Sequence, residues 1–407
     1  MTTLIKNISQ ALTLQSAFIK DGRNLDAIDL SVIQDASLLF DEQKIIWIGK
    51  KSELPAKMKI EKVIDLEGRV LTPEIVDSHT HLVFAGDRSG EYVSRLNGIS
   101  YQDIYKEGGG INLTVKSTTA ISSDQLYNDA KERIERISSF GVGTIEIKSG
   151  YGLSLLEEKK ITLVIDKLKK HYENHIQIFN TFCAAHAIPP GKTSTQYLNE
   201  VVWPLLEEFG NLKIIDAVDI FFEKDYFNHA ETDELLIRAK KFSLLGKIHA
   251  DEFNDNKGAI LACKHQALSC DHLLETREDG FKALANSKTV ATLLPGTSLF
   301  LGKKFSRARE LLDLGGKVAI ASDYNPGSCH FDNLIFLAAL SAPQYKMNIA
   351  ELWAAITLNA SHALGKLHQG ALVVGMKPRF SVFDTDHFEM ITYSWGKNLA
   401  IPWKQLI

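Results

Sequence analysis

The chain has 407 residues, of which 45% are hydrophobic and 24% charged, and its 46 basic and 50 acidic side chains give a net charge of −4. This is the composition of an ordinary globular protein with room for one large domain and a smaller companion. Proteins that bind nucleic acids or membrane surfaces usually carry a surplus of basic residues, so we expect neither partner. We also expect no membrane span, because the longest apolar runs are too short.

The cysteines and the first residues bear on cellular location. The four cysteines, which form no Cys-x-x-Cys pair, are Cys183, Cys263, Cys270 and Cys329. Residues 1–20 do not resemble a signal peptide. Together these features predict a reduced, cytoplasmic protein whose cysteines serve as packing residues.

Short strands are predicted near both ends of the chain. They are residues 36–40, 44–49, 62–65, 372–374 and 380–383. The first two flank a turn-like segment and therefore predict a hairpin. We interpret residues 1–72 and 365–407 together as a small β-sandwich domain built from both termini.

Between these ends, predicted strands alternate with predicted helices. The strands begin at Ile75 and continue with residues 144–148, 176–183, 217–222, 247–250, 267–270, 290–294 and 317–321. Alternation of this kind predicts a parallel sheet, and eight units favour a closed (β/α)₈ TIM barrel over residues 73–364. The alternative is a doubly wound open sheet. It needs a glycine-rich phosphate turn after its first strand, where this chain has His79-Thr80-His81.

Histidines and one aspartate stand at the carboxyl ends of these strands. His79 and His81 end the first strand, His186 follows the third, His249 ends the fifth, His272 follows the sixth and Asp323 ends the eighth. In a barrel these strand ends line one mouth, so we expect the side chains to converge there. His79 and His81 also face the same way, because alternate residues of a strand share a face.

This set predicts a metal site, which needs three or four protein ligands and an open position for water. We predict that one ion per subunit is held by His79, His81, His249 and Asp323, a ligand set that suits zinc or iron. Such an ion activates water and polarises a carbonyl group. Lys148 also ends a strand. A carbamylated lysine that bridges a second metal is one interpretation, and an ion pair or a substrate contact is the one we favour.

Three residues are candidates for proton transfer. Glu252 follows His249 by three residues, where a carboxylate can move protons during hydrolysis. His272 is a candidate for deprotonating water or holding a developing oxyanion, and Asp323 for carrying a proton to a leaving nitrogen. The neighbouring Asp251 is instead expected in a solvent-exposed acidic loop.

Longer motifs carry a family resemblance. They are residues 77–88 (DSHTHLVFAGDR), 146–152 (EIKSGYG), 185–190 (AHAIPP) and 322–328 (SDYNPGS). The His-x-His pattern with a later histidine and a final aspartate resembles the amidohydrolase superfamily. The longer motifs resemble its imidazolonepropionase family, and the similarity extends over nearly the whole chain.

The resemblance implies hydrolysis of the ring amide of 4-imidazolone-5-propanoate to N-formimidoyl-L-glutamate, with Zn²⁺ or Fe³⁺ as the metal. The predicted metal ligands match those of the family. Substrate contacts are matched by Arg88, Tyr151, His186, Glu252 and Ser328, and product contacts by Asn325 and Gly327. One departure is Glu74, which stands where the family commonly has Pro-Gly before the first strand. We expect a homodimer.

The implied substrate is an anion, and the chain offers groups to recognise it. A long loop is predicted over residues 84–119, and loops of this length are usually functional. Arg88 on this loop supplies a planar, bidentate partner for a carboxylate. Tyr151 lies between two glycines that allow a tight turn, so its hydroxyl can reach a ligand.

Two other functions fit parts of the pattern. A nucleobase deaminase shares the metal ligands and the His-x-x-Glu spacing, but its neutral substrates have no evident need for Arg88. A non-catalytic scaffold with this fold would be expected to lose ligands, and all four are present here.

Overall fold

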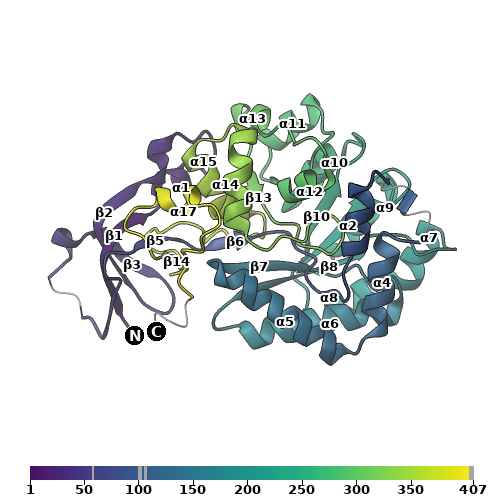
Figure 1. Ribbon diagram of the computed structural model, residues 1–407, viewed down its shortest axis with the longest axis horizontal. Helices are drawn as coiled ribbons and strands as arrows, with labels where there is room; N and C mark the ends of the chain where they lie inside the picture. Colours follow the sequence, from purple (N-terminus) through teal and green to yellow (C-terminus); the bar gives the residue numbers. More distant parts are fainter. Residues whose placement is uncertain (57–58, 100–102, 105–107, 403–407) are drawn as a thin grey trace.

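The computed structural model describes residues 1–56, 59–99, 103–104 and 108–402, which form an eight-stranded parallel sheet and a six-stranded mixed sheet (Figure 1). The strands of the parallel sheet are β6 (Ile75–Asp77), β7 (Val142–Lys148), β8 (Gln177–Ala185), β9 (Ala217–Phe222), β10 (Leu245–Ala250), β11 (Ser269–His272), β12 (Val290–Leu293) and β13 (Val318–Ile320). Each strand pairs with the next along the chain, and every pairing is parallel.

The first and last strands of this sheet meet just beyond their carboxyl ends. Thr80 and Tyr324 form a parallel bridge. The His81 N–H donates to the Tyr324 carbonyl at 2.9 Å, and the Asp323 N–H donates to the His79 carbonyl at 3.0 Å. The predicted (β/α)₈ barrel is therefore confirmed, and its closing seam itself carries three of the predicted metal ligands.

Helices cover the outside of the barrel (Figure 1). Those on the barrel are α5 (Ser123–Ser139), α6 (Leu155–Tyr172), α7 (Ser194–Tyr197), a π-helical turn (Leu198–Val202), α8 (Trp203–Leu212), α9 (His229–Lys240), α10 (Gly258–His265), α11 (Glu278–Ala285), α12 (Pro295–Leu301), α13 (Ala308–Asp313), α14 (Leu334–Tyr345), α15 (Ile349–Ile356) and α16 (Leu358–His362). Helix α5 shows why they form. Ser122 caps its first turn, and the apolar residues at helical spacing, Leu126, Ala130, Ile134 and Ile137, are the buried ones.

Across the described ranges, no helix combines enough length with enough apolar character to cross a bilayer.

The segment after the first barrel strand was predicted to be one long loop, and the structure differs from this prediction. It contains helix α2 (Ser89–Leu96) and helix α4 (Ile111–Ala120), while residues 100–102 and 105–107 lie outside the described part. The loop prediction for residues 84–119 was therefore wrong over these two helices. The glycine run at 108–110, read as loop, stands directly before α4.

Segments from both ends of the chain form the second sheet, drawn in purple and yellow in Figure 1. Its strands are β1 (Thr3–Leu12), β2 (Val32–Phe40), β3 (Ile45–Lys50), β4 (Lys62–Asp65), β5 (Val70–Pro73) and β14 (Phe380–Phe383). The order is β14-β5-β1-β2-β3, with β4 also paired to β1. The predicted unit from both termini is present, as one mixed sheet rather than two. The boundaries 1–72, 73–364 and 365–407 stay a prediction.

Two details of this unit were not foreseen. Strand β1 was missed, and residues 372–374 are not a strand. Leu372 is nevertheless fully buried against the sheet, and its N–H donates to the Thr13 carbonyl at 2.8 Å. At Leu372, the apolar sequence therefore indicated burial rather than pairing in a strand. Short helical segments complete the chain: α1 (Gln15–Ile19), Ala27–Leu30, Lys51–Glu53 and α17 (Glu389–Tyr393).

Glu74, the departure from the family pattern, connects the two sheets. Its buried carboxylate accepts hydrogen bonds from Arg379 Nε at 2.9 Å and Thr144 Oγ1 at 2.5 Å, and Arg379 Nη2 lies 2.6 Å from it. Arg379 precedes β14 and Thr144 lies in β7. The residue thus joins the barrel to the C-terminal segment.

Arg23 seals the amino end of the barrel, opposite the predicted site. Its guanidinium donates to the carbonyls of Ala285 at 2.9 Å, Gly315 at 2.6 Å and Ser287 at 2.5 Å. We expect Arg23→Ala to lower the free energy of unfolding by about 2–4 kcal/mol, because three charge-assisted bonds to carbonyls are lost together. Urea denaturation measures this loss, and kcat should stay unchanged. Arg277→Ala, at a side chain 77% exposed, is the matched control; an equal loss there would contradict the assignment.

Candidate active site

A cavity of about 830 Å³ opens at the carboxyl end of the barrel. The predicted site residues in its wall are His81, Arg88, Tyr151, His186, His249, Glu252, His272, Asp323, Asn325 and Ser328. His79 lies where the first and last strands of the barrel meet, and its side chain is fully buried. Gly327 lies directly beside the guanidinium of Arg88. The structure therefore brings all the predicted site residues to one place.

The four predicted metal ligands converge at the base of this cavity. Nε2 of His81 lies 3.2 Å from Nε2 of His249. Oδ1 of Asp323 lies 3.5 Å from Nε2 of His79 and 3.9 Å from Nε2 of His81. Two atoms bound about 2.1 Å from a tetrahedral ion lie roughly 3.4 Å apart. Each of these three distances is therefore compatible with two ligands of one ion, and His79, His81 and Asp323 form a group whose ligand atoms all lie within 4.8 Å of one another.

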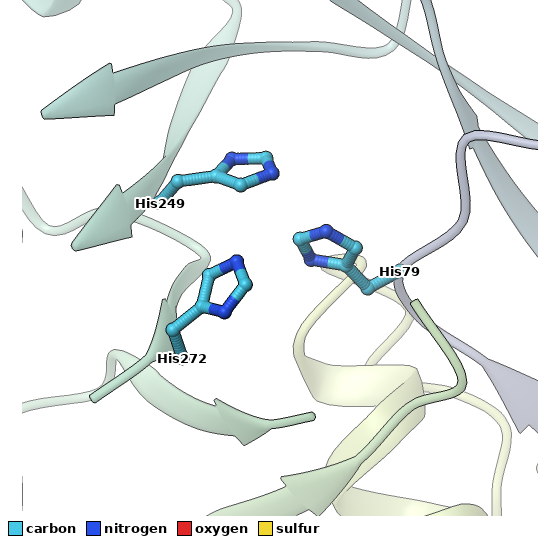
Figure 2. A group of neighbouring side chains, drawn as sticks. All are labelled: His79, His249 and His272. Atoms are coloured by element: carbon cyan, nitrogen blue, oxygen red, sulfur yellow. The ribbon is translucent and has the colours of Figure 1, made fainter. Parts of the chain in front are cut away.

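His272 belongs to the same cluster. Figure 2 shows that the imidazoles of His79, His249 and His272 point toward one another from three separate elements. Their ring centroids are 4.6 Å apart for His79 and His249, 5.4 Å for His249 and His272, and 5.8 Å for His79 and His272. His272 is thus close enough to contact any group bound at the four ligands.

The backbone at two of these positions is strained. His272 has φ of 79° and Asp323 has φ of 52°, in the left-handed region that non-glycine residues rarely adopt. Each such residue costs on the order of 1–3 kcal/mol, and such residues cluster at functional sites.

A carboxylate behind His79 fixes which of its ring nitrogens faces the site, and a second carboxylate lies beside the ring of His249. Nδ1 of His79 lies 2.7 Å from Asp271, and Nδ1 of His249 lies 3.1 Å from Asp219. Nε2 of His79, although buried, has no hydrogen-bond partner among the described residues. An unpartnered ring nitrogen whose other nitrogen is held by a carboxylate is the arrangement of a metal ligand. The residues present therefore fit the ion.

The protonation states of His79 and His81 agree with this fit. Burial, reinforced by Lys148, holds the pKa of His79 well below its usual value, and burial with the neighbouring histidines does the same for His81. Both rings are therefore neutral and keep a lone pair for a metal. Burial alone would lower the pKa of His249, but Asp219 outweighs it and the pKa is raised.

Lys148 is part of a buried charge network under the site. Its Nζ lies 2.5 Å from Asp219 and 3.0 Å from Glu146. Lys247 also reaches Glu146, at 2.9 Å. Burial opposes the ammonium form of Lys148, but the carboxylates around it outweigh burial and raise its pKa. Because carbamylation requires a neutral amine, the geometry favours the ion pair over a bridging lysine.

These buried charges were not predicted as site residues, apart from Lys148. The signal was available in the sequence, because charged residues inside strands that are otherwise apolar must be paired. The network consists of Glu146, Lys148, Asp219, Lys247 and Asp271, all with fully or almost fully buried side chains.

Glu252 faces the cavity with 9% of its surface exposed. Its carboxylate lies 3.8 Å from Nε2 of His272 and 3.7 Å from Nζ of Lys303. Burial raises the pKa of Glu252 to about 7, against the opposing effect of Lys303. Burial likewise raises the pKa of Asp323 to about 6, against a hydrogen bond from Thr297. Both groups can therefore exchange protons near neutral pH.

The loop that carries Glu252 is braced on both sides. Asp251, expected to be exposed, is fully buried and accepts hydrogen bonds from the Gly258 N–H at 3.1 Å and from Thr276 Oγ1 at 2.8 Å. Glu223 accepts from the Phe253 N–H at 2.8 Å. The expectation for Asp251 was wrong because the chain turns back over this carboxylate, which stabilises the turn.

The upper part of the cavity has aromatic and polar groups. The ring of His186 stacks on that of His81, with centroids 4.6 Å apart and planes at 14°, and Tyr151 lies 5.6 Å from His186. Asn325 Oδ1 accepts hydrogen bonds from the N–H groups of Gly327 and Ser328, each at 2.8 Å. Asn325 therefore shapes the turn that follows Asp323.

The chain is similar to several known proteins. No family model matches the chain. An imidazolonepropionase of Bdellovibrio bacteriovorus is 37% identical over 402 residues, which cover 98% of this chain and 94% of the relative. One of Clostridium tetani is 36% identical over 403 residues, covering 98% and 95%. One of Idiomarina loihiensis is 40% identical over 370 residues, 90% of each chain.

Solved structures with the same fold are more distant in sequence. An adenosine deaminase from Xanthomonas campestris with bound zinc superposes with a TM-score of 0.72 at 14% identity, covering 98% of this chain and 90% of that one. A guanine deaminase from C. acetobutylicum with bound guanine gives a TM-score of 0.69 at 14% identity and covers 98% of both chains. At this identity the likeness concerns the fold alone.

Proposed function

This chain belongs to the imidazolonepropionase family, and on that premise we propose that it hydrolyses 4-imidazolone-5-propanoate to N-formimidoyl-L-glutamate, the third step of L-histidine degradation to L-glutamate. The protein is a metal-dependent hydrolase that opens a carbon–nitrogen bond in a cyclic amide. One observation carries the assignment of the site: three histidines and an aspartate meet at the base of a cavity whose wall also presents Arg88.

His79, His81, His249 and Asp323 would hold one Zn²⁺ or Fe³⁺ ion per subunit. Nitrogen and oxygen ligands suit either metal. When bound, the ion supplies Lewis acidity, which activates water and polarises the amide carbonyl. The hydrogen bond with Asp271 would keep Nε2 of His79 directed toward the ion, and Asp219 places a negative charge 3.1 Å from Nδ1 of His249.

The protein's own groups move the protons. Glu252 takes a proton from the attacking water, for which its raised pKa is suited. His272 is neutral, because burial holds its pKa well below the usual value, and its single N–H donates to the carbonyl oxygen as negative charge develops there. Asp323 then takes the proton of the hydroxyl group that the attack has placed on the carbonyl carbon and delivers it to the ring nitrogen as the carbon–nitrogen bond breaks. The product is a carboxylate, and Glu252 releases its proton to solvent.

The remaining residues orient the substrate. Arg88 pairs with the propanoate carboxylate, while Tyr151 and His186 contact the ring. Glu252 and Ser328 complete the contacts to the substrate, and Asn325 and Gly327 contact the product. The ring of His186 stacks on that of His81, so this substrate contact lies next to a proposed metal ligand.

The decisive assay follows the ultraviolet absorbance of imidazolone propanoate with purified protein. We expect hydrolysis that a chelator abolishes. Release of ammonia from cytosine, guanine or adenine derivatives, with no turnover of imidazolone propanoate, would favour the deaminase alternative. A metal content far below one per chain that added metal does not restore would favour the scaffold.

Arg88→Ala is expected to raise KM about 10- to 100-fold with little change in kcat, because one charge-assisted contact to the substrate is worth about 1.5–3 kcal/mol. Steady-state kinetics on imidazolone propanoate measure this. The uncharged propanamide analogue is the matched control, and the variant should handle it as well as the wild type does. An unchanged KM for the acid would remove Arg88 from the site.

Assembly and location complete the proposal. We expect a cytoplasmic homodimer acting on a small molecule, with no nucleic-acid or membrane partner. Light scattering of the purified protein tests the oligomeric state, and a mass equal to one chain would contradict the dimer.

A further inference from the structure

We propose that Glu91 and Gly327 are positioning residues that clamp the Arg88 guanidinium from two sides and so hold it in place for the substrate carboxylate. This inference rests on the proposed function and assigns Glu91 and Gly327 roles that act through Arg88. Residue 327 must then be a glycine because the Arg88 side chain fills the space beside it, and not only because this residue contacts the reacting molecule.

Glu91 holds one edge of the guanidinium. Its Oε2 accepts a hydrogen bond from Arg88 Nε at 2.8 Å and lies 2.6 Å from Nη2. The two side chains are largely buried, with 8% and 12% of their surfaces exposed. Oε1 of Glu91 accepts from the Gly110 N–H at 2.8 Å. One carboxylate therefore fixes Arg88 to the residue that precedes α4.

Gly327 bounds the opposite side. A Cβ placed on Gly327 would overlap Nη1 of Arg88 and would lie 2.5 Å from Cζ and 3.2 Å from Nε. The φ angle of Gly327 is not in the left-handed region, so its backbone would admit any residue. Space, rather than conformation, requires glycine here. The Asn325 side chain fixes the Gly327 N–H at 2.8 Å, so the backbone does not yield easily.

The clamp has a consequence for binding. An arginine side chain is flexible, and ordering it when the substrate arrives weakens binding. With Glu91 on one edge and the Gly327 backbone against Nη1, that ordering is complete before the substrate enters. Loss of either side should therefore weaken carboxylate binding much as loss of Arg88 does, without changing the chemical step.

The test compares Gly327→Ala, Glu91→Gln and Arg88→Ala, singly and in pairs. We measure KM and kcat for imidazolone propanoate, and Kd for the unreactive anion imidazole-4-propanoate by calorimetry. Each single variant should raise KM and Kd, by up to about 10- to 100-fold, with kcat nearly constant. Combining Gly327→Ala or Glu91→Gln with Arg88→Ala should add nothing further, since all three act on one contact.

Gly90→Ala is the matched control. It makes the same change one residue before Glu91, where an added Cβ meets no atom within 4 Å, and it should leave KM and Kd unchanged. Full additivity of Gly327→Ala with Arg88→Ala would show that Gly327 contacts the ligand independently and would overturn the clamp. So would a wild-type KM in both Gly327→Ala and Glu91→Gln.

The outcomes separate this inference from the proposed function. If Arg88→Ala weakens binding and the two clamp variants do not, the clamp alone fails. If the wild type binds imidazole-4-propanoate without hydrolysing the substrate, the proposed reaction fails and Kd decides the clamp. If the wild type does neither, both are overturned. If Arg88→Ala changes neither constant, the clamp fails and Arg88 is removed from the site, while turnover by the wild type still decides the proposed reaction.

Discussion

Removal of the metal by a chelator is expected to lower kcat/KM at least about 10³-fold, because the ion contributes several kcal/mol to stabilising the transition state. His81→Ala should have an effect of the same order, since Nε2 of His81 lies 3.2 Å from His249 and 3.9 Å from Asp323 at the centre of the ligand set. Elemental analysis should find one ion per chain in the wild type. Adding back Zn²⁺ or Fe³⁺ separately then identifies the metal that restores activity.

Asp271→Asn should have a smaller effect than loss of a metal ligand. Its carboxylate contacts Nδ1 of His79 at 2.7 Å without facing the cavity. We expect metal affinity to fall about 10- to 100-fold, with activity restored by excess metal. Full activity in the stripped protein, or two ions per chain, would contradict the single-metal site.

Glu252→Gln is expected to lower kcat about 10²- to 10⁴-fold with little change in KM, because the amide fills the same space and cannot accept the proton of the attacking water. The pH dependence provides the diagnostic. Burial raises the pKa of Glu252 to about 7, and only the ionised carboxylate accepts a proton. Wild-type kcat/KM should therefore fall as the pH decreases through about 7. Residual activity of the variant should lack this acidic limb.

Asp251→Asn is the control for this experiment. Asp251 precedes Glu252 but is buried and bonded to Thr276 and Gly258, so its loss should lower the melting temperature while the acidic limb remains. An unchanged kcat in Glu252→Gln would remove Glu252 from proton transfer and leave His272 as the candidate base.

Elements that depend on local pattern could be predicted from the sequence. Helix α5 is an example, because its apolar residues Leu126, Ala130, Ile134 and Ile137 recur at helical spacing in the sequence and are the buried ones. Strand β9 was predicted with its observed limits because apolar residues surround one inward acid, Asp219. Strand β1 was missed, since its apolar residues are interrupted and two of its partners, β4 and β5, lie about 50 or more residues further along the chain.

By itself, the sequence determined the order of strands and helices, and it placed histidines and an aspartate at strand ends. A barrel gathers its strand ends at one mouth, so these positions sufficed to propose four metal ligands. Only the tertiary structure decided what surrounds them. Asp271 and Asp219 behind the histidines, the burial that shifts the pKa of Glu252, and the contact of Arg88 with Gly327 join residues up to 239 positions apart. Such contacts depend on how strands close and loops fold back, for which short-range pattern carries no signal.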